Sequence, residues 1–274
     1  MQVSGAARPG ESAWRQRTFW EKMLAVLQAE GLVKRFEEIE AVRGVSLAVG
    51  AGEVVGLLGP NGAGKTTTLR MLAGILTPSA GRVLVGGIDL RARPLEAKRR
   101  IGFLSGDTQL YQRLSPREVL TYFGRLYGLD EARLSRRVAE LIDQLDMGAF
   151  AARPCGTLSS GQKQRANIAR AFLHEPDVLI LDEPTAALDV ITGQFIVESI
   201  RRERAAGRAV LFSTHIMGEA GYLCDRIVLL HDGRVIDAGT LGELLQRTGC
   251  DNLTDAFLLH VRRGRNLADA PIGT

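Results

Sequence analysis

A glycine-rich segment between an apolar strand and a helix constrains this chain more than any other feature. Residues 59–66 read G-P-N-G-A-G-K-T and match the pattern G-x-x-x-x-G-K-[ST]. The preceding residues 54–58 are apolar throughout, as in a parallel strand that is buried on both faces, and residues 66–76 carry a helical period. A strand, a glycine-rich loop and a helix in this order predict an α/β fold.

The chemistry of this segment suits it to phosphate. Glycines let successive backbone N–H groups converge on phosphate oxygens, and the N-terminus of the following helix adds a positive partial charge. We expect the Lys65 ammonium to reach the β- and γ-phosphates of a nucleotide and the Thr66 hydroxyl to bind Mg²⁺. An ordinary glycine-rich turn is the alternative, which the flanking strand and helix disfavour. The candidate nucleotide-binding residues here are Gly59, Pro60, Asn61, Gly62, Ala63, Gly64, Lys65, Thr66 and Thr67.

A second apolar run ends in two carboxylates. Residues 178–183 read V-L-I-L-D-E, and open α/β sheets bind ligands at the carboxyl ends of their strands. Because Mg²⁺ in phosphoryl-transfer sites is usually held by a carboxylate, a hydroxyl and phosphate oxygens, Asp182 is predicted to bind it beside Thr66. The adjacent Glu183 is predicted to polarise the attacking water. The alternative is a solvated acidic pair before the turn at Pro184, which the phosphate-binding segment upstream disfavours.

Composition excludes several classes of protein. The 274 residues are 45% hydrophobic and 24% charged, as in folded globular proteins. The longest stretches without Asp, Glu, Lys or Arg are 11 residues, whereas a bilayer span takes about 20 apolar residues. The formal charge is +4, but no basic run exceeds residues 98–100, so nucleic-acid binding is not expected. Three cysteines without a C-x-x-C pair suggest neither a disulfide framework nor a zinc site, and a reducing cytoplasm fits best.

A helical segment separates the two motifs. Residues 116–148 follow a Ser-Pro start and carry apolar residues spaced by threes and fours. This helical segment is therefore predicted to interrupt a sheet whose strands lie on both sides of it in the sequence. The strand patterns lie at residues 24–27, 41–49, 54–58, 178–181, 209–212 and 227–230.

A third segment narrows the interpretation. Residues 158–162 read L-S-S-G-Q and precede a helical segment and the pair Asp182-Glu183. Taken alone, such a cluster is usually a loop or a helix N-cap. The order of the three segments resembles that of the ATP-binding cassette (ABC) ATPases, whose signature is close to L-S-G-G-Q and differs here only at Ser160. The resemblance covers roughly residues 24–240 and implies ATP and Mg²⁺ as ligands.

Further residues acquire roles from the resemblance. Asp189 matches the D-loop, His215 matches the H-loop histidine that contacts the γ-phosphate, and Phe36 matches the aromatic A-loop residue that stacks on adenine. A lone His or Phe is more often structural, so these two roles depend on the resemblance. In the family, two cassettes pack head to tail and the signature of one chain completes the ATP site of the other, so we expect a homodimer. The signature residues implied at the nucleotide are Ser159, Ser160, Gly161 and Gln162.

The fold implied by the resemblance is α/β: a P-loop NTPase ABC cassette with a RecA-like core, an antiparallel β subdomain and an inserted helical subdomain. The ATPase domain is expected over residues 23–240, with its helical subdomain at about 106–175. We expect residues 1–22 to be a loose N-terminal extension; an amphipathic arm on a membrane or partner is the alternative. A C-terminal helical segment and tail are expected over 241–274, frayed from residue 264.

One family position does not match. After residues 101–104 the family has a Pro and the Q-loop glutamine, a ligand of Mg²⁺ and water, whereas this chain has Ser105-Gly106 and places Gln109 three residues late. Three alternatives follow: Gln109 supplies the missing amide ligand, a water molecule takes its place, or this chain does not need a ligand at that position. The displacement of Gln109 favours water, because extended chain advances about 3.3 Å per residue and a side chain rarely spans a shift of three residues. The departure resembles the ATPase subunit of sodium-extruding (NatA-type) ABC transporters, as does the segment 122–129.

The implied function is ATP hydrolysis that drives export, with sodium efflux as the specific form, through a separate membrane-spanning permease. The chain is then expected on the cytoplasmic face of the plasma membrane. A soluble ABC ATPase that acts on nucleic acid or ribosomes is the alternative; the single cassette and the absence of a long heptad insertion or basic block disfavour it. A P-loop kinase or GTPase is disfavoured because the chain has no N-K-x-D guanine motif.

Overall fold

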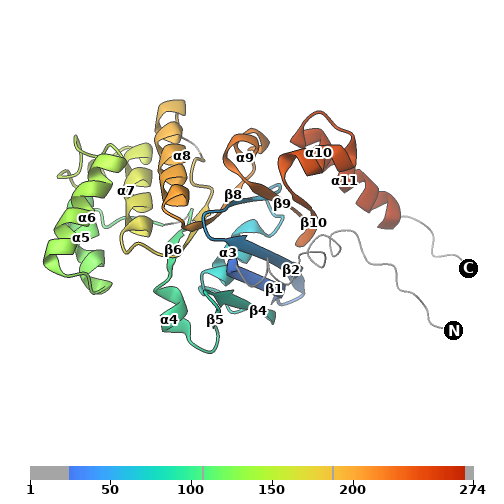
Figure 1. Ribbon diagram of the computed structural model, residues 1–274, viewed down its shortest axis with the longest axis horizontal. Helices are drawn as coiled ribbons and strands as arrows, with labels where there is room; N and C mark the ends of the chain where they lie inside the picture. The colour runs from blue at the N-terminus through green and yellow to red at the C-terminus, as the bar shows by residue number, and fades with distance from the viewer. Residues whose placement is uncertain (1–24, 107, 187, 269–274) are drawn as a thin grey trace, which may run out of the picture.

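The computed structural model describes residues 25–106, 108–186 and 188–268, which form two β-sheets with helices between and around them (Figure 1). A six-stranded sheet has, in spatial order, the strands β10 (Arg234–Gly239), β9 (Arg226–His231), β3 (Val54–Leu58), β8 (Ala209–Thr214), β7 (Val178–Asp182) and β6 (Ile101–Leu104). A four-stranded antiparallel sheet has the strands β2 (Ile39–Gly50), β1 (Ala25–Phe36), β4 (Ala80–Val85) and β5 (Ile88–Asp89). This is the α/β class that the sequence predicts.

Parallel pairing dominates the six-stranded sheet. The neighbouring pairs β6/β7, β7/β8, β8/β3 and β3/β9 are all parallel, and β10 is an antiparallel edge strand beside β9. Every residue of β3, β7 and β8 is buried, which explains why their sequences are apolar almost throughout rather than alternating. Because the strands are parallel, their carboxyl ends meet at one edge of the sheet.

Helix α3 (Lys65–Leu72) packs against strands of both sheets. It buries Leu69 and Leu72 in one apolar cluster with Leu57 of β3 and Val45 of β2. The sequence predicts this helix up to residue 76, but it ends at Leu72. Gly74 follows in the left-handed conformation at φ +69°, which favours glycine and ends a helix.

The antiparallel hairpin is longer than the sequence pattern predicts. Strand β1 extends well beyond the predicted residues 24–27, and β2 extends slightly beyond the predicted residues 41–49. The added parts of the strands contain partly exposed polar residues, so they lack the apolar runs that indicate a strand in the sequence. Their inward-facing residues, among them Leu27 and Val45, complete the cluster around α3.

Helices occupy the predicted helical segment between β6 and β7. They are α5 (Pro116–Leu126) and α6 (Glu131–Gln144), and α7 (Ser160–Phe172) follows further along the chain. A short helix, α4 (Pro94–Lys98), precedes β6. A turn through Gly128, at φ +80°, separates α5 from α6. Ser115 caps α5 in a capping box with Glu118, and Asp130 caps α6. Each such cap is worth about 1 kcal/mol and fixes where a helix begins.

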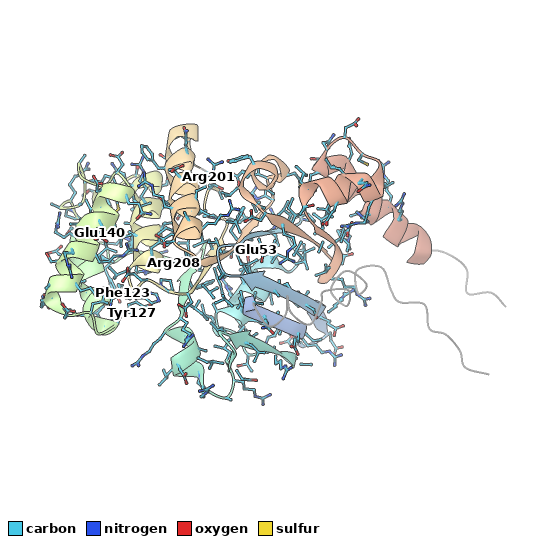
Figure 2. All side chains as sticks on the ribbon, in the orientation of Figure 1. Glu53, Phe123, Tyr127, Glu140, Arg201 and Arg208 are labelled. Carbon is cyan, nitrogen blue, oxygen red and sulfur yellow. The ribbon has the colours of Figure 1, made fainter. Side chains whose placement is uncertain are left out.

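Apolar packing and buried charge join this insert to the sheet. Leu120 of α5, Leu141 of α6 and Phe212 of β8 belong to one buried cluster. Arg137 of α6 lies 3.8 Å from the Glu203 carboxylate of α8 (Val190–Ala205). Glu203 also lies 2.7 Å from Arg208, which Figure 2 shows close to the end of α8. Because Glu203 is buried, its two cationic partners offset the cost of removing the charge from water.

The C-terminal helices pack against the far part of the sheet. They are α9 (Met217–Leu223), α10 (Leu241–Thr248) and α11 (Leu253–Ala268), and Leu253 and Phe257 of α11 share a buried cluster with Leu229 of β9. The sequence predicts fraying from residue 264, whereas α11 continues to Ala268. The expected extension over residues 1–22 and the final residues 269–274 lie outside the described part. None of the helices in the described residues is both long and apolar enough to span a membrane.

One buried carboxylate anchors these helices to the sheet. Asp237 of β10 lies 2.9 Å from the Arg247 guanidinium of α10 and 2.9 Å from His260 Nε2 of α11. Burial opposes ionisation of Asp237, but the contacts with His260 and Arg247 outweigh it and lower the pKa of this carboxyl. The ionised form of Asp237 therefore stabilises the folded protein.

Asp237→Asn is expected to lower the free energy of unfolding by about 1–3 kcal/mol near pH 7, because charged hydrogen bonds are lost. A carboxyl whose folded-state pKa is lowered contributes its full stability above the unfolded-state pKa, about 3.9, and loses it as the pH falls through the folded-state value. Denaturation at several pH values should therefore show the variant and parent converging below about pH 4. Asp251→Asn, at an exposed position, is the control. A constant difference across this range would contradict the assignment.

Candidate active site

The glycine-rich loop joins the end of β3 to the start of α3. A Cβ at Gly59 would lie 2.2 Å from the Leu230 carbonyl oxygen, which is too close for any side chain to fit. Gly64 caps α3 at φ +98°, and a Cβ there would lie 2.7 Å from the Ala41 carbonyl oxygen. Backbone from two other strands thus crowds the loop, and glycine is required at both positions. Because the loop leaves the carboxyl end of β3, the first N–H groups of α3 lie at the carboxyl edge of the sheet.

Lys65, the first residue of α3, keeps its charge inside the mouth of this loop. Only 5% of the residue is exposed, and its Nζ donates to the carbonyl oxygens of Gly59 at 2.8 Å and Pro60 at 3.2 Å. The same ammonium lies 3.6 Å from Glu183 Oε1. The cation is therefore held where phosphate is expected, close to the predicted general base.

The two carboxylates lie on and just beyond the end of β7. Asp182 is 4% exposed and pairs in register with Ser213 of β8, whose Oγ donates to Asp182 Oδ1 at 2.6 Å. Glu183 has φ +48°, a left-handed conformation uncommon outside glycine, which ends the strand. Both carboxylates are predictable from the sequence, whereas no role for Ser213 is. Its one signal is a hydroxyl at the end of an otherwise apolar strand.

Glu183 also contacts the predicted H-loop histidine. His215 Nδ1 lies 3.1 Å from Glu183 Oε2, while Lys65 lies near the other oxygen of that carboxylate. His215 follows β8, and its side chain is exposed. An ammonium, a carboxylate and an imidazole from three residues far apart in the sequence thus meet at the edge of the sheet.

A cavity of about 370 Å³ opens beside these groups. Its lining includes the hydroxyl-bearing Thr66 and the carboxylate-bearing Asp182, and these hard oxygen donors are the kind that Mg²⁺ prefers. The residues present therefore fit the predicted cation. The cavity is lined by Thr66, Gly106, Ser160, Gln164, Asp182, Glu183, Ala186 and Leu188.

The signature segment reaches the same cavity from the helical insert. Ser159 caps α7 in a capping box with Gln162, so the alternative interpretation as a helix N-cap is also correct. Ser160 lines the cavity. Gln164, one turn further and not singled out in the sequence, also lines it and donates its amide to the Pro184 carbonyl oxygen at 2.9 Å. This hydrogen bond ties α7 to the segment that follows the two carboxylates.

Phe36 and Asp189 are among the predicted site residues that do not line this cavity. Phe36, at the end of β1, is 44% exposed, and the Lys34 ammonium lies 5.1 Å from its ring centroid. Asp189 caps α8, where its carboxylate accepts from the Thr192 N–H at 2.9 Å and the Thr192 hydroxyl at 2.8 Å. An exposed ring suits stacking on a base and a capping carboxylate suits helix α8, but the roles implied by the family for these two residues stay predictions.

The position of the missing Q-loop glutamine faces open space. Gly106 is exposed and lines the cavity, and a Cβ built on it would meet nothing within 4 Å. Gln109 is exposed, and it is not among the cavity-lining side chains in the described part of the chain. This geometry supports water rather than Gln109 in place of the amide.

Gln109→Ala is therefore expected to change the turnover of ATP hydrolysis by less than about threefold, with ATP affinity unchanged. Steady-state hydrolysis and nucleotide binding measure the two quantities separately. Lys65→Ala, which removes a cation from the phosphate-binding loop, serves as the comparison and should lose ATP affinity. A tenfold fall in turnover for folded Gln109→Ala protein, about 1.4 kcal/mol, would show that Gln109 reaches the reaction centre.

Comparison with known proteins places this geometry in a family. The family model described as "ABC transporter" matches residues 42–186. The ABC transporter ATP-binding protein NatA of Bacillus subtilis (strain 168) is 42% identical over 236 residues, 84% of this chain and 96% of NatA. The Nod factor export ATP-binding protein I of Ralstonia nicotianae is 39% identical over 227 residues, 82% of this chain and 71% of that protein.

A solved structure agrees with these matches. It is a dimeric post-hydrolysis state of an ATP-binding cassette bound to ADP and Pi, with a TM-score of 0.72 and 28% identity over 78% of this chain and 98% of that one. The matched residues 42–186 include the glycine-rich loop, the signature and both carboxylates. ABC ATPases bind ATP with Mg²⁺, form dimers and work with membrane permeases. This chain belongs to the ABC transporter family and is an ATP-binding, ATP-hydrolysing subunit.

Proposed function

We propose that this chain powers export through a separate membrane permease, by ATP hydrolysis at the site built on Lys65, Asp182 and Glu183. The observation that carries the hydrolytic part is the meeting of Lys65, Glu183 and His215 beside a cavity lined by Thr66. Export is supported by the similarity to a Nod factor export protein that spans 82% of this chain.

Each side chain has a role that its place permits. Lys65 binds the β- and γ-phosphates by exchanging its contacts with the loop carbonyls for phosphate oxygens. Glu183 orients the attacking water and accepts its proton. His215, adjacent to the other oxygen of Glu183, donates toward the γ-phosphate. Thr66 and Asp182 would hold Mg²⁺, which when bound neutralises charge on the phosphate oxygens.

A homodimer is the simplest assembly for this subunit. The start of α7 carries the signature residues Ser159, Gly161 and Gln162 together with Ser160. The N-terminus of a helix presents backbone N–H groups that can bind an anion. We propose that the signature residues bind the ATP held by Lys65 of a second copy, with Phe36 stacked on adenine and Asp189 near the dimer contact. The similarity to a dimeric cassette supports this arrangement.

Peripheral attachment to the cytoplasmic face of the plasma membrane follows from this role. The permease supplies the membrane path, and the ion or molecule exported is selected there. Sodium is the substrate that we propose, on the resemblance to NatA-type subunits. An ATPase acting on nucleic acid or ribosomes is the competing function, which the sequence disfavours because no basic run exceeds three residues.

Glu183→Gln is expected to lower steady-state ATP hydrolysis at least a hundredfold, because an amide keeps the shape of the side chain but cannot accept the proton from water. ATP binding should be retained, and an ATP-bound dimer should accumulate and be visible by size-exclusion chromatography. Glu175→Gln is a matched control, because Glu175 pairs with Arg133 and precedes β7, at the opposite end of the strand from Glu183. This variant should hydrolyse ATP normally. Hydrolysis by Glu183→Gln at the parental rate would overturn the assignment.

Export is tested with the permease present. The chain is expected to copurify with membranes only when a multi-span partner is coexpressed, and inverted vesicles holding both should take up ²²Na⁺ on addition of ATP. The same vesicles with Lys65→Ala are the control. ATPase activity without sodium movement would reject sodium as the substrate. Copurification with ribosomes or DNA that persists at high salt would favour the competing function, because purely electrostatic binding fades steeply with salt.

A further inference from the structure

We propose that Ser213 is a positioning residue for ATP hydrolysis: its hydroxyl orients the Asp182 carboxylate and helps to hold the backbone of Glu183 at the end of β7. The inference rests on the proposed roles of Asp182 and Glu183. It concerns a residue of β8 that does not line the cavity in the described part of the chain.

The hydroxyl of Ser213 is used twice. It donates to Asp182 Oδ1 at 2.6 Å and accepts from the Glu183 backbone N–H at 3.0 Å. Ser213 itself is fully buried, at 0% exposure, within a strand whose preceding residues 209–212 are all apolar. A buried hydroxyl is costly unless it is hydrogen-bonded, and here both its proton and a lone pair have partners. The partners are the two residues on which the proposed chemistry depends.

For Asp182, the contact restrains the carboxyl group. A hydrogen bond from a hydroxyl to a carboxylate is short and strong, and here it engages one of the two oxygens. The carboxyl group of Asp182, buried except at the cavity, therefore faces that cavity in one orientation. Ser213 thus orients a carboxylate that would hold the cation.

For Glu183, the contact holds an uncommon backbone conformation. The residue has φ +48°, and its N–H lies between the Oγ of Ser213 at 3.0 Å and the carbonyl oxygen of Ser213 at 3.2 Å. From this conformation the Glu183 side chain reaches both Lys65 and His215. The backbone acceptor survives any substitution of the Ser213 side chain, so we expect the larger effect of a variant on Asp182.

A purely structural role makes a different prediction. A serine that only satisfies its neighbours would lower stability when replaced, without altering the requirement for the cation. Ser199 of α8 provides a matched control, because it is also buried, at 1% exposure, and its hydroxyl donates to the Phe195 carbonyl oxygen at 2.8 Å. Ser199→Ala should therefore lower stability but leave hydrolysis and its Mg²⁺ dependence unchanged.

The test compares Ser213→Thr with Ser213→Val, two β-branched side chains of the same shape that differ in the hydroxyl and suit a strand. We expect Ser213→Thr to keep kcat within about threefold of the parent. Ser213→Val should lower kcat about tenfold and raise the Mg²⁺ concentration for half-maximal rate several-fold, with KM for ATP little changed. If the added methyl group prevents folding, Ser213→Ala takes the place of Ser213→Val and should show the same two changes.

A readout without turnover completes the test. Mn²⁺ titrated into the complex with a non-hydrolysable ATP analogue, followed by electron paramagnetic resonance, should bind several-fold more weakly in Ser213→Val or Ser213→Ala than in the parent. Parental kcat and parental Mn²⁺ affinity in a folded variant without the hydroxyl would overturn the proposal. If Glu183→Gln also hydrolyses ATP normally, the site assignment fails instead, and the two failures are thereby distinguished.

Discussion

The parallel pairing of β3, β8 and β7 is the constraint on which the site depends. Strand β8 lies between the other two, and the register pairs Leu58 with Thr214 and Asp182 with Ser213. The phosphate-binding loop leaves the end of β3, the two carboxylates end β7, and His215 follows β8, so one sheet edge collects all three. Glu183 then links them, because its two oxygens lie near Lys65 and His215.

The helical insert is attached to this edge by specific polar contacts as well as by its apolar core. Gln164 of α7 donates to the Pro184 carbonyl beyond the carboxylates, and Asn167 donates to the Thr108 carbonyl at 3.0 Å in the segment that replaces the Q-loop. Helix α7 is therefore hydrogen-bonded to the segment after the carboxylates and to the segment after β6, and its own Ser160 lines the cavity.

Prediction from sequence succeeds where one local segment carries the whole signal. The loop at residues 59–66 and the pair Asp182-Glu183 are recognisable because strand, turn and ligand chemistry are contiguous there. It fails where solvent exposure or neighbouring elements decide the structure: β1 and β2 are longer than their apolar runs, and α3 ends early at Leu72, just before the left-handed Gly74. Ser213 is invisible for the same reason, since its importance comes from a partner on another strand.

The sequence by itself determined the α/β class, the phosphate-binding loop, the order of the motifs and the identity of the carboxylates, because each depends on residues adjacent in the chain. Only the tertiary structure decided which of these groups meet. It brought Lys65 within 3.6 Å of Glu183, joined the hydroxyl of Ser213 to the Asp182 carboxylate and the Glu183 backbone N–H, and placed Gln109 away from the cavity lining in the described part. The physical reason is that strand register and backbone conformation, not spacing along the chain, set distances between side chains on different strands.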